Sequence, residues 1–314
     1  MKIAFFTEGE AFGKVPRNFP NMRTDMAWMC ALDASRIPYK NASRIDDTFD
    51  LGICIIPKEI KLGHQNAAME PGDIEIIKTK CKKIAAMQEG PQWYFQDYPL
   101  DKQIWFFNTL QEMDFLLVHN EIDKKYYEGL TGKQCRIMPS LMIEDSISSL
   151  ETPERSGVII GGNFCSWYGG FDSYMMAQEF DCPISIPSMG RKIEGEDQLP
   201  NLNHLPFMMW IDWIKALNNF KYGIHLMRTH AAGTFALNCA YLGIPCIGYE
   251  GLDTQELCHP SLTVKVGDLN GVREKIESLK DEDYYFQSSK QAKFNYNQYY
   301  TEQKFKENFL NDNK

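Results

Sequence analysis

The sequence predicts an α/β protein with two tandem Rossmann-like domains, each a doubly wound parallel sheet, facing a central cleft. The length of 314 residues suits two domains that each bury a core. Apolar runs of strand length alternate with helical patterns, and a polar break at 140–156 precedes a fresh strand, "GVIIGG". We therefore expect an N-terminal domain over 1–148, a C-terminal domain over 157–290 and a C-terminal helix over 291–314.

The first half of the chain contains four apolar runs of strand length. Continuous apolar runs are typical of parallel strands covered on both faces. The predicted strands are residues 2–6 ("KIAFF"), 49–56, 82–88 and 114–120. Helical patterns between them fall at 22–34, 73–81 and 100–113.

The second half repeats this alternation. The predicted strands are residues 157–162, 182–188, 222–227, 244–249 and 262–266. The predicted helices are 171–180, 206–220 and 234–242, followed by a helical, aromatic stretch from residue 278 onward. Ligands of open parallel sheets bind beyond the carboxyl ends of the strands, so the loops after the strands are where we expect a site.

The totals indicate a soluble globular protein, with 44% hydrophobic and 24% charged residues. We find no apolar run of membrane-spanning length and no secretory pattern in the first residues, so we expect an intracellular protein. Nine cysteines without zinc-site spacing predict free thiols. The net charge of −9 argues against indiscriminate binding to nucleic acid. Residues 1–83, however, hold 13 basic against 11 acidic residues, which is ordinary variation or a surface that tolerates a polyanion.

Residues 225–248, "HLMRTHAAGTFALNCAYLGIPCIG", read as strand, loop, helix and strand. Gly233 stands where the loop meets the helix, whose first N–H groups and dipole favour phosphate. Arg228 can fork onto two phosphate oxygens, and Thr234 can add a hydroxyl. The same small residues also suit a strand–helix–strand unit that binds nothing, and the sequence leaves both interpretations open.

This stretch, with its "GIPCIGYEG" continuation, resembles the donor-binding region of GT-B glycosyltransferases. "VIIGGNFCSWYGGFDSYMMAQ" (158–178) resembles the opening of that family's C-terminal domain, and residues 114–140 resemble the last strands of its N-terminal domain. The resemblance covers roughly residues 110–265. It implies the GT-B fold and transfer of a hexosyl or pentosyl group from a nucleoside-diphosphate sugar, foremost a UDP-sugar. It implies neither a cofactor nor a metal.

The resemblance also implies roles for individual residues. His230 and Asn238 stand where many family members carry two acidic residues. Asn238 would then contact the ribose hydroxyls as a neutral partner, and His230 the sugar or phosphate. Gly162 and Asn163 would lie near the diphosphate or on the acceptor side. The pair Gly161-Gly162 reads equally well as a tight turn.

In inverting GT-B enzymes the general base commonly lies on the N-terminal domain. Asp25, with its neighbour Arg23, is our candidate, because both fall at a helix start after the first strand. The other interpretation is an acidic residue favoured by the helix dipole alone.

The loop "QEGPQWYFQDYP" is the candidate acceptor site. It carries Glu89, Trp93 and Asp97, and carboxylates bind hydroxyls while aromatic faces stack on sugars or bases. The other interpretation is a packed connector with Trp93 in the core. The string "DED" at 281–283 reads as a helix cap rather than a metal site.

The acceptor stays open at this stage. A hydroxylated DNA base is one candidate, because some phage DNA glucosyltransferases share this compact fold. The protein would then work in the host cytoplasm, and otherwise in the cytoplasm of its own cell. The overall acidity weighs against DNA, and a sugar, a lipid-linked sugar or a small metabolite is otherwise open. A sugar-nucleotide 2-epimerase or a non-catalytic nucleotide-sugar-binding protein would also fit this fold.

Overall fold

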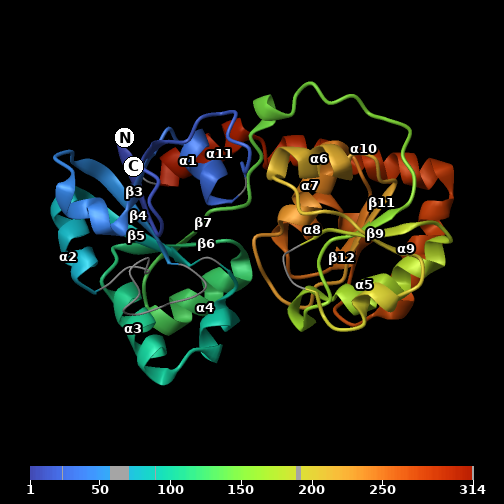
Figure 1. Ribbon diagram of the computed structural model, residues 1–314, viewed down its shortest axis with the longest axis horizontal. Coiled ribbons are helices and arrows are strands. Elements are labelled where there is room, and N and C mark those ends of the chain that lie inside the picture. The colour runs from blue at the N-terminus through green and yellow to red at the C-terminus, as the bar shows by residue number, and fades with distance from the viewer. Residues whose placement is uncertain (23, 57–70, 89, 189–191, 313–314) are drawn as a thin grey trace. The chain divides into compact units, whose positions relative to one another are not determined.

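The computed structural model describes residues 1–22, 24–56, 71–88, 90–188 and 192–312 (Figure 1). The chain divides into two compact units, each with one sheet. The N-terminal unit comprises Met1–Phe19, Thr24–Pro139 and Lys306–Lys314, and the C-terminal unit comprises Ser140–Phe305 with a short stretch that begins at Pro20. The division after Pro139 precedes the boundary that we expected at residue 148.

The N-terminal sheet has seven strands in the order β2-β3-β1-β4-β5-β6-β7. They are β1 (Ile3–Thr7), β2 (Gly13–Lys14), β3 (Ser35–Pro38), β4 (Phe49–Ile56), β5 (Cys81–Gln88), β6 (Phe115–Val118) and β7 (Cys135–Ile137). All pairs are parallel except β2 with β3. The four expected strands are β1, β4, β5 and β6. The short strands β2 and β3, of which β2 lies at one edge of the sheet, were not predicted because they lack a continuous apolar run.

The helices of this unit are α1 (Asp25–Ala31), α2 (Pro71–Lys80), α3 (Leu100–Gln111), α4 (Glu121–Thr131) and α11 (Glu302–Asp312), with 3-10 turns η1 (Tyr39–Arg44) and η2 (Gln92–Asp97). In Figure 1, α3 and α4 lie on one side of the sheet, and α1 and α11 lie on the other. The helix predicted over 22–34 is shorter in the structure. It ends because Asp33, with a φ of 48°, turns the chain into β3.

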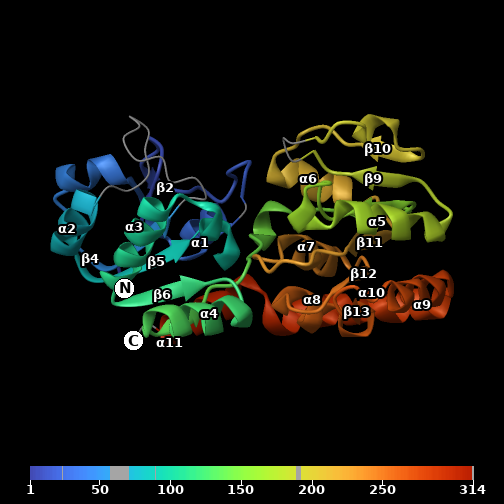
Figure 2. The same cartoon turned by 90° about the horizontal axis from the view of Figure 1, so that it is seen from below.

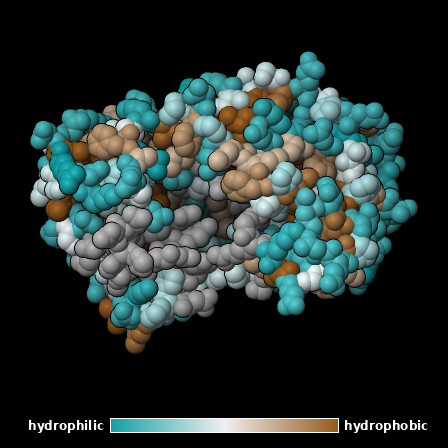
Figure 3. Space-filling view, in the orientation of Figure 1, coloured by the Kyte–Doolittle hydropathy of each residue, from teal (hydrophilic) through white to brown (hydrophobic). Residues whose placement is uncertain are grey.

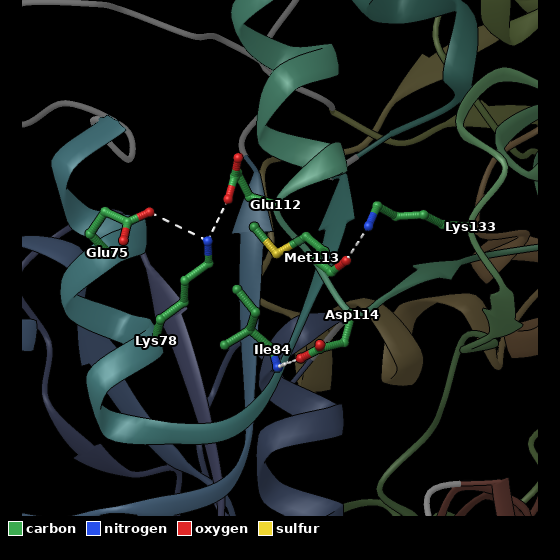
Figure 4. Close-up of polar contacts among 7 residues, drawn as sticks. All are labelled: Glu75, Lys78, Ile84, Glu112, Met113, Asp114 and Lys133. Atoms are coloured by element: carbon green, nitrogen blue, oxygen red, sulfur yellow. Dashed lines mark hydrogen bonds and ion pairs between the residues drawn. The ribbon is translucent and has the colours of Figure 1, made fainter.

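A polar cluster fixes the side of the sheet where β6 begins (Figure 4). Lys78 of α2 bridges Glu75 and Glu112. The Asp114 carboxylate accepts a hydrogen bond from the Ile84 N–H at 2.7 Å. These contacts join α2, β5 and the end of α3. They lie away from the carboxyl ends of the strands, where ligands bind, so we assign them a structural role.

The C-terminal sheet is wholly parallel, in the order β10-β9-β8-β11-β12-β13. Its strands are β8 (Val158–Ile160), β9 (Ile184–Ile186), β10 (Leu202–His204), β11 (Tyr222–His225), β12 (Cys246–Tyr249) and β13 (Thr263–Val264). In chain order this is 3-2-1-4-5-6, the arrangement of dinucleotide-binding Rossmann domains. The strand order reverses between β8 and β11, which is where such sheets bind ligands.

Helices cover both faces of this sheet (Figures 1 and 2). They are α5 (Gly170–Ala177), α6 (Trp210–Leu217), α7 (Thr234–Leu242), α8 (Asp253–Cys258), α9 (Leu269–Lys280) and α10 (Glu282–Tyr299). α5 and α9 pack together on one face, while α10 packs against α7 and α8. The Asp281 carboxylate accepts from the Tyr284 N–H at 2.8 Å, so this acid caps α10 as predicted.

The face drawn in Figure 3 is largely hydrophilic, with separate patches of hydrophobic residues. Single exposed apolar side chains such as Phe207 and Phe294 are ordinary for a globular surface. Within the described ranges, no helix combines the length and the hydropathy that crossing a bilayer requires.

Candidate functional site

The candidate site lies at the carboxyl ends of β8 and β11, where the C-terminal sheet reverses its order. Two loops meet there, one after each strand. The Leu226 N–H donates to Ser173 Oγ at 2.9 Å, and Thr229 Oγ1 donates to the Trp167 carbonyl at 2.8 Å. Gly169 has a φ of 62°, and a Cβ there would stand 2.0 Å from the Leu226 carbonyl oxygen. The two loops are therefore fixed against each other.

Arg228 is exposed and follows β11 in this loop. Its Nη2 donates to Asp172 Oδ2, in the first turn of α5, at 2.6 Å. The hydrogen bond and the charge of Asp172 raise the pKa of Arg228. Because this contact uses one nitrogen, the other N–H groups of the guanidinium remain available to an anion. Asp172 was not predicted from the sequence. It holds Arg228, the predicted phosphate-binding residue, in place.

Gly233 precedes α7 with a φ of 66°. A Cβ at Gly233 would lie 1.9 Å from Thr254 Oγ1, and that hydroxyl donates to the Gly233 carbonyl at 2.9 Å. The glycine is therefore required by packing against α8 as well as by its backbone conformation. The first amide N–H groups of α7 stand at the end of the sheet, as the phosphate-binding prediction needs.

Thr234 Oγ1 lies 3.1 Å from Ser140 Oγ, which donates to the Ala232 carbonyl at 2.6 Å. Since the Ser140 proton is used there, Thr234 must be the donor in the hydroxyl pair. This pair anchors the amino end of α7. A phosphate contact by Thr234 stays a prediction.

His230 is half-buried, and burial lowers its pKa, partly opposed by Glu256. Asn238 is only 1% exposed. With its amide oriented to satisfy both neighbours, its nitrogen donates to the Thr234 carbonyl and its oxygen accepts from Trp213 Nε1, each at 3.2 Å. A ribose contact by Asn238 stays a prediction, and it requires the amide to exchange one of these partners.

The loop after β8 contains the predicted Gly162 and Asn163, both buried. Asn163 Oδ1 accepts from the Cys165 N–H at 3.1 Å, which shapes the turn into the 3-10 helix η4 (Ser166–Tyr168). A Cβ on Gly162 would stand 2.7 Å from Tyr168 Cβ. Both residues thus build the loop, and their contact with a diphosphate stays a prediction.

The N-terminal candidates lie on several elements. Asp25 is half-buried in the first turn of α1, and Thr24 before it has an unusual φ of 48°. Trp93 is half-buried on η2, which ends at Asp97. The core aromatic of this loop is Phe95, packed 4.6 Å from Phe106 between ring centroids. Arg23 and Glu89 lie outside the described residues, and all these roles stay predictions.

Polar residues at three strand ends escaped the sequence reasoning. Thr7 ends β1, Gln88 ends β5 and His119 follows β6, and all three are buried. Thr7 Oγ1 and Gln88 Nε2 have no hydrogen-bond partner among the described residues, and the His119 ring lies 5.5 Å from Trp28. The sequence feature that could have identified these three residues is a single polar residue at the end of an apolar run. In the part of the chain that is described, no cluster of three or more metal-ligating side chains occurs.

Comparison with known proteins gave a structural match only. No family model matches the sequence, and no curated protein matches it. The α-glucosyltransferase AGT in complex with UDP is 13% identical, with a TM-score of 0.66 over 99% of both chains. HepE from Anabaena in complex with UDP-glucose is 10% identical, with a TM-score of 0.64 over 99% of both chains.

A third match is an S. aureus TarM variant in complex with UDP, 9% identical, with a TM-score of 0.62. The match covers 90% of this chain but only 58% of TarM, so this chain spans less than two thirds of that protein. At such identities the likeness establishes the fold. The chain has the GT-B fold, with two Rossmann-like units, and the expectation drawn from the sequence is confirmed at that level.

Proposed function

We propose that this protein is a glycosyltransferase that moves a sugar from a nucleoside-diphosphate sugar, foremost a UDP-sugar, to an acceptor hydroxyl. The observation that carries the proposal is the pairing of Arg228, in the loop between β11 and α7, with Asp172 of α5 at the switch point of a Rossmann sheet. The structures of AGT, HepE and TarM, which contain UDP or UDP-glucose, support the same class of donor.

The chemistry follows from the charge that develops on the leaving group. As the bond between the sugar and the diphosphate breaks, negative charge grows on the diphosphate. Fixed N–H donors of α7 and the guanidinium of Arg228 stabilise that charge without a metal. A base removes the proton of the acceptor hydroxyl, and Asp25 with Arg23 is our candidate pair for the acceptor side.

Binding of nucleotides tests the donor site first. Wild type is titrated calorimetrically with UDP, GDP, ADP, CMP and their sugars, and UDP should bind most tightly. Arg228→Ala should weaken UDP binding about tenfold or more, because a charge-assisted contact is lost. Arg273→Ala is the matched control, since Arg273 also pairs with an acid of this unit, Glu179, at 3.3 Å. Failure of all nucleotides to bind wild type would refute the proposal.

Turnover separates the enzyme from its alternatives. With the donor nucleotide identified, the glycosyltransferase hypothesis expects Asp25→Asn to bind the donor normally and to lose transfer. A sugar-nucleotide 2-epimerase would instead change the donor sugar with no acceptor present. A non-catalytic binding protein would show donor affinity without turnover in wild type.

The acceptor is the least constrained part of the proposal. A structure of an α-glucosyltransferase contains UDP and a DNA 13-mer with an HMU base, and by analogy we propose a hydroxylated DNA base as one candidate acceptor. The protein would then act in the cytoplasm, in a host cell if it is phage-encoded. The charge of the N-terminal unit favours an acceptor that is less anionic than DNA, because several of its lysines are already paired with acidic residues. The pairs are Lys2–Asp47, Lys14–Asp33, Lys40–Glu10 and Lys82–Asp50. Transfer to DNA containing 5-hydroxymethyl bases, compared with unmodified DNA and with free sugars, distinguishes these acceptors.

A further inference from the structure

A buried histidine, His225, lies at the same switch point of the C-terminal unit. None of the contacts described above involves it. His225 is the last residue of β11 and is 7% exposed. Its Nε2 is buried without a hydrogen-bond partner among the described residues. Burial lowers the pKa of the ring to about 4, so the imidazole is neutral at physiological pH. A neutral ring carries one N–H donor and one acceptor nitrogen.

The surroundings of the ring are shaped to hold it. Gly161 stands beside His225, and a Cβ there would lie 2.5 Å from the histidine Cγ, so the ring occupies space that any other residue would fill. Phe235 of α7 packs edge-on against the ring at 5.5 Å, and Tyr168 stacks on it at 6.5 Å. The position of a Gly162 Cβ would be 3.2 Å from Nε2. The unpartnered Nε2 therefore lies against the Gly161–Gly162 turn that follows β8.

Nothing in the fold requires an imidazole at this position. A buried polar atom without a partner destabilises the folded state, whereas a phenyl ring of similar shape would carry no such penalty. His259 of the same unit shows the contrast. It is also buried, and its Nδ1 has no hydrogen-bond partner among the described residues, but its Nε2 lies 3.0 Å from the Ala236 carbonyl and links α8 to α7. One hydrogen bond between helices therefore accounts for an imidazole at His259, whereas no contact within the described residues accounts for Nε2 of His225.

We propose that His225 Nε2 donates a hydrogen bond to a diphosphate oxygen of the nucleotide sugar, held between the Gly161–Gly162 turn and the amino end of α7. This inference rests on the proposed function and adds a specificity-determining residue to it. A neutral donor selects for the diphosphate by hydrogen bonding while Arg228 supplies the charge. Binding moves the glycine turn enough for the oxygen to reach Nε2, which glycines permit because they carry no side chain.

The test compares the binding of UDP, UDP-glucose and uridine to wild type, His225→Phe and His225→Gln. His225→Phe should raise the Kd for UDP about 10- to 100-fold and leave uridine binding unchanged, because one hydrogen bond to a charged group is lost. His225→Gln should recover part of the UDP affinity, since its amide N–H can donate. Without ligand, His225→Phe should be at least as stable as wild type, because it removes a buried unpaired nitrogen. A ligand-induced shift of the His225 Nε2 resonance provides a second readout.

Tyr222→Phe is the matched control, because it removes a polar atom from the first residue of the same strand, away from the site. It should leave UDP affinity unchanged. Equal UDP affinity in wild type and His225→Phe would overturn the inference, as would a loss confined to UDP-glucose, which would assign the nitrogen to the sugar. If wild type binds no nucleoside diphosphate, the proposed function itself fails, so the two failures are distinguishable.

Discussion

At the scale of single residues, the usefulness of Arg228 depends on Asp172. A long exposed arginine loses considerable side-chain entropy when it is fixed on a ligand. Asp172 is only 22% exposed and sits in the first turn of α5, so it orients the guanidinium before any ligand arrives. The acid is a positioning residue, because it acts through Arg228.

We expect Asp172→Asn to weaken UDP binding about three- to tenfold, because Arg228 loses its fixed orientation. Calorimetric titration measures the change. Asp212→Asn is the control, since Asp212 is also a first-turn acid, on α6, with a basic partner, Lys215, at 3.3 Å. Tighter UDP binding in Asp172→Asn would show instead that the carboxylate competes with phosphate for the arginine.

Two buried histidines predict how stability depends on pH. Burial lowers the pKa of His225 and of His259 to about 4, against about 6.5 in an unfolded chain. The unfolded state therefore binds more protons between these values, and stability falls as the pH drops from about 6.5 toward 4. At pH 5 each ring should cost about 2 kcal/mol.

Urea denaturation at pH 7.5 and pH 5.0 measures this effect. The loss between the two pH values should be smaller in His225→Phe than in wild type by about 2 kcal/mol, because the titrating ring is gone. An identical loss in both proteins would show that His225 titrates normally in the folded state.

At the scale of elements, α7 is held at its amino end by its glycine. Gly233→Ala should destabilise the protein by about 2–4 kcal/mol, because the methyl group collides with Thr254 and the backbone is left-handed. Gly132→Ala is the matched control. Gly132 ends α4 with a φ of 69°, and a methyl group there would meet no described atom within 4 Å, so this change should cost only about 1 kcal/mol. Equal losses in the two variants, measured by urea denaturation, would contradict the packing argument.

The far end of α7 is held by a residue of the connector. Arg155 donates to the Asn218 carbonyl at 3.0 Å, to the Gly243 carbonyl at 3.2 Å and to the Leu242 carbonyl at 2.6 Å. A cation at the carboxyl ends of α6 and α7 also complements their dipoles. The polar segment that reads as a linker therefore fixes two helices of the C-terminal unit.

At the scale of the whole molecule, the two ends of the chain belong to one unit. The last helix, α11, crosses from the C-terminal unit back to the N-terminal one, and in Figures 1 and 2 its red ribbon lies with the N-terminal strands and helices. Phe309 on this helix is 6% exposed. The expected separate C-terminal helix over 291–314 is therefore two helices, since α10 already spans residue 291.

Phe309→Ala should destabilise the N-terminal unit by about 3–5 kcal/mol, because a buried ring is lost. Hydrogen exchange should then accelerate in β1, β4 and β5 and stay unchanged in β8, β11 and β12. Phe286→Ala is the control, since Phe286 on α10 is 56% exposed and should cost little. Faster exchange confined to the C-terminal strands would contradict the assignment of α11.

The amino-acid sequence alone was enough to predict the fold class, since the long central strands are continuous apolar runs that alternate with helical patterns. It also located the loop from Arg228 to Gly233, because the glycine, the arginine and the small-residue helix are adjacent in the chain. Short strands such as β3 and β10 could not be predicted, because they are too brief to form a continuous apolar run and are recognised only by their pairing with neighbouring strands.

Which polar groups already have hydrogen-bond partners can be seen only in the folded protein. Asp172 meets Arg228 across 56 residues, and Ser140 meets Thr234 across 94. The orphan Nε2 of His225 is visible only once Gly161 and Phe235 enclose the ring. Local pattern is encoded by neighbouring residues, whereas hydrogen-bond satisfaction depends on contacts that exist only after the chain has folded.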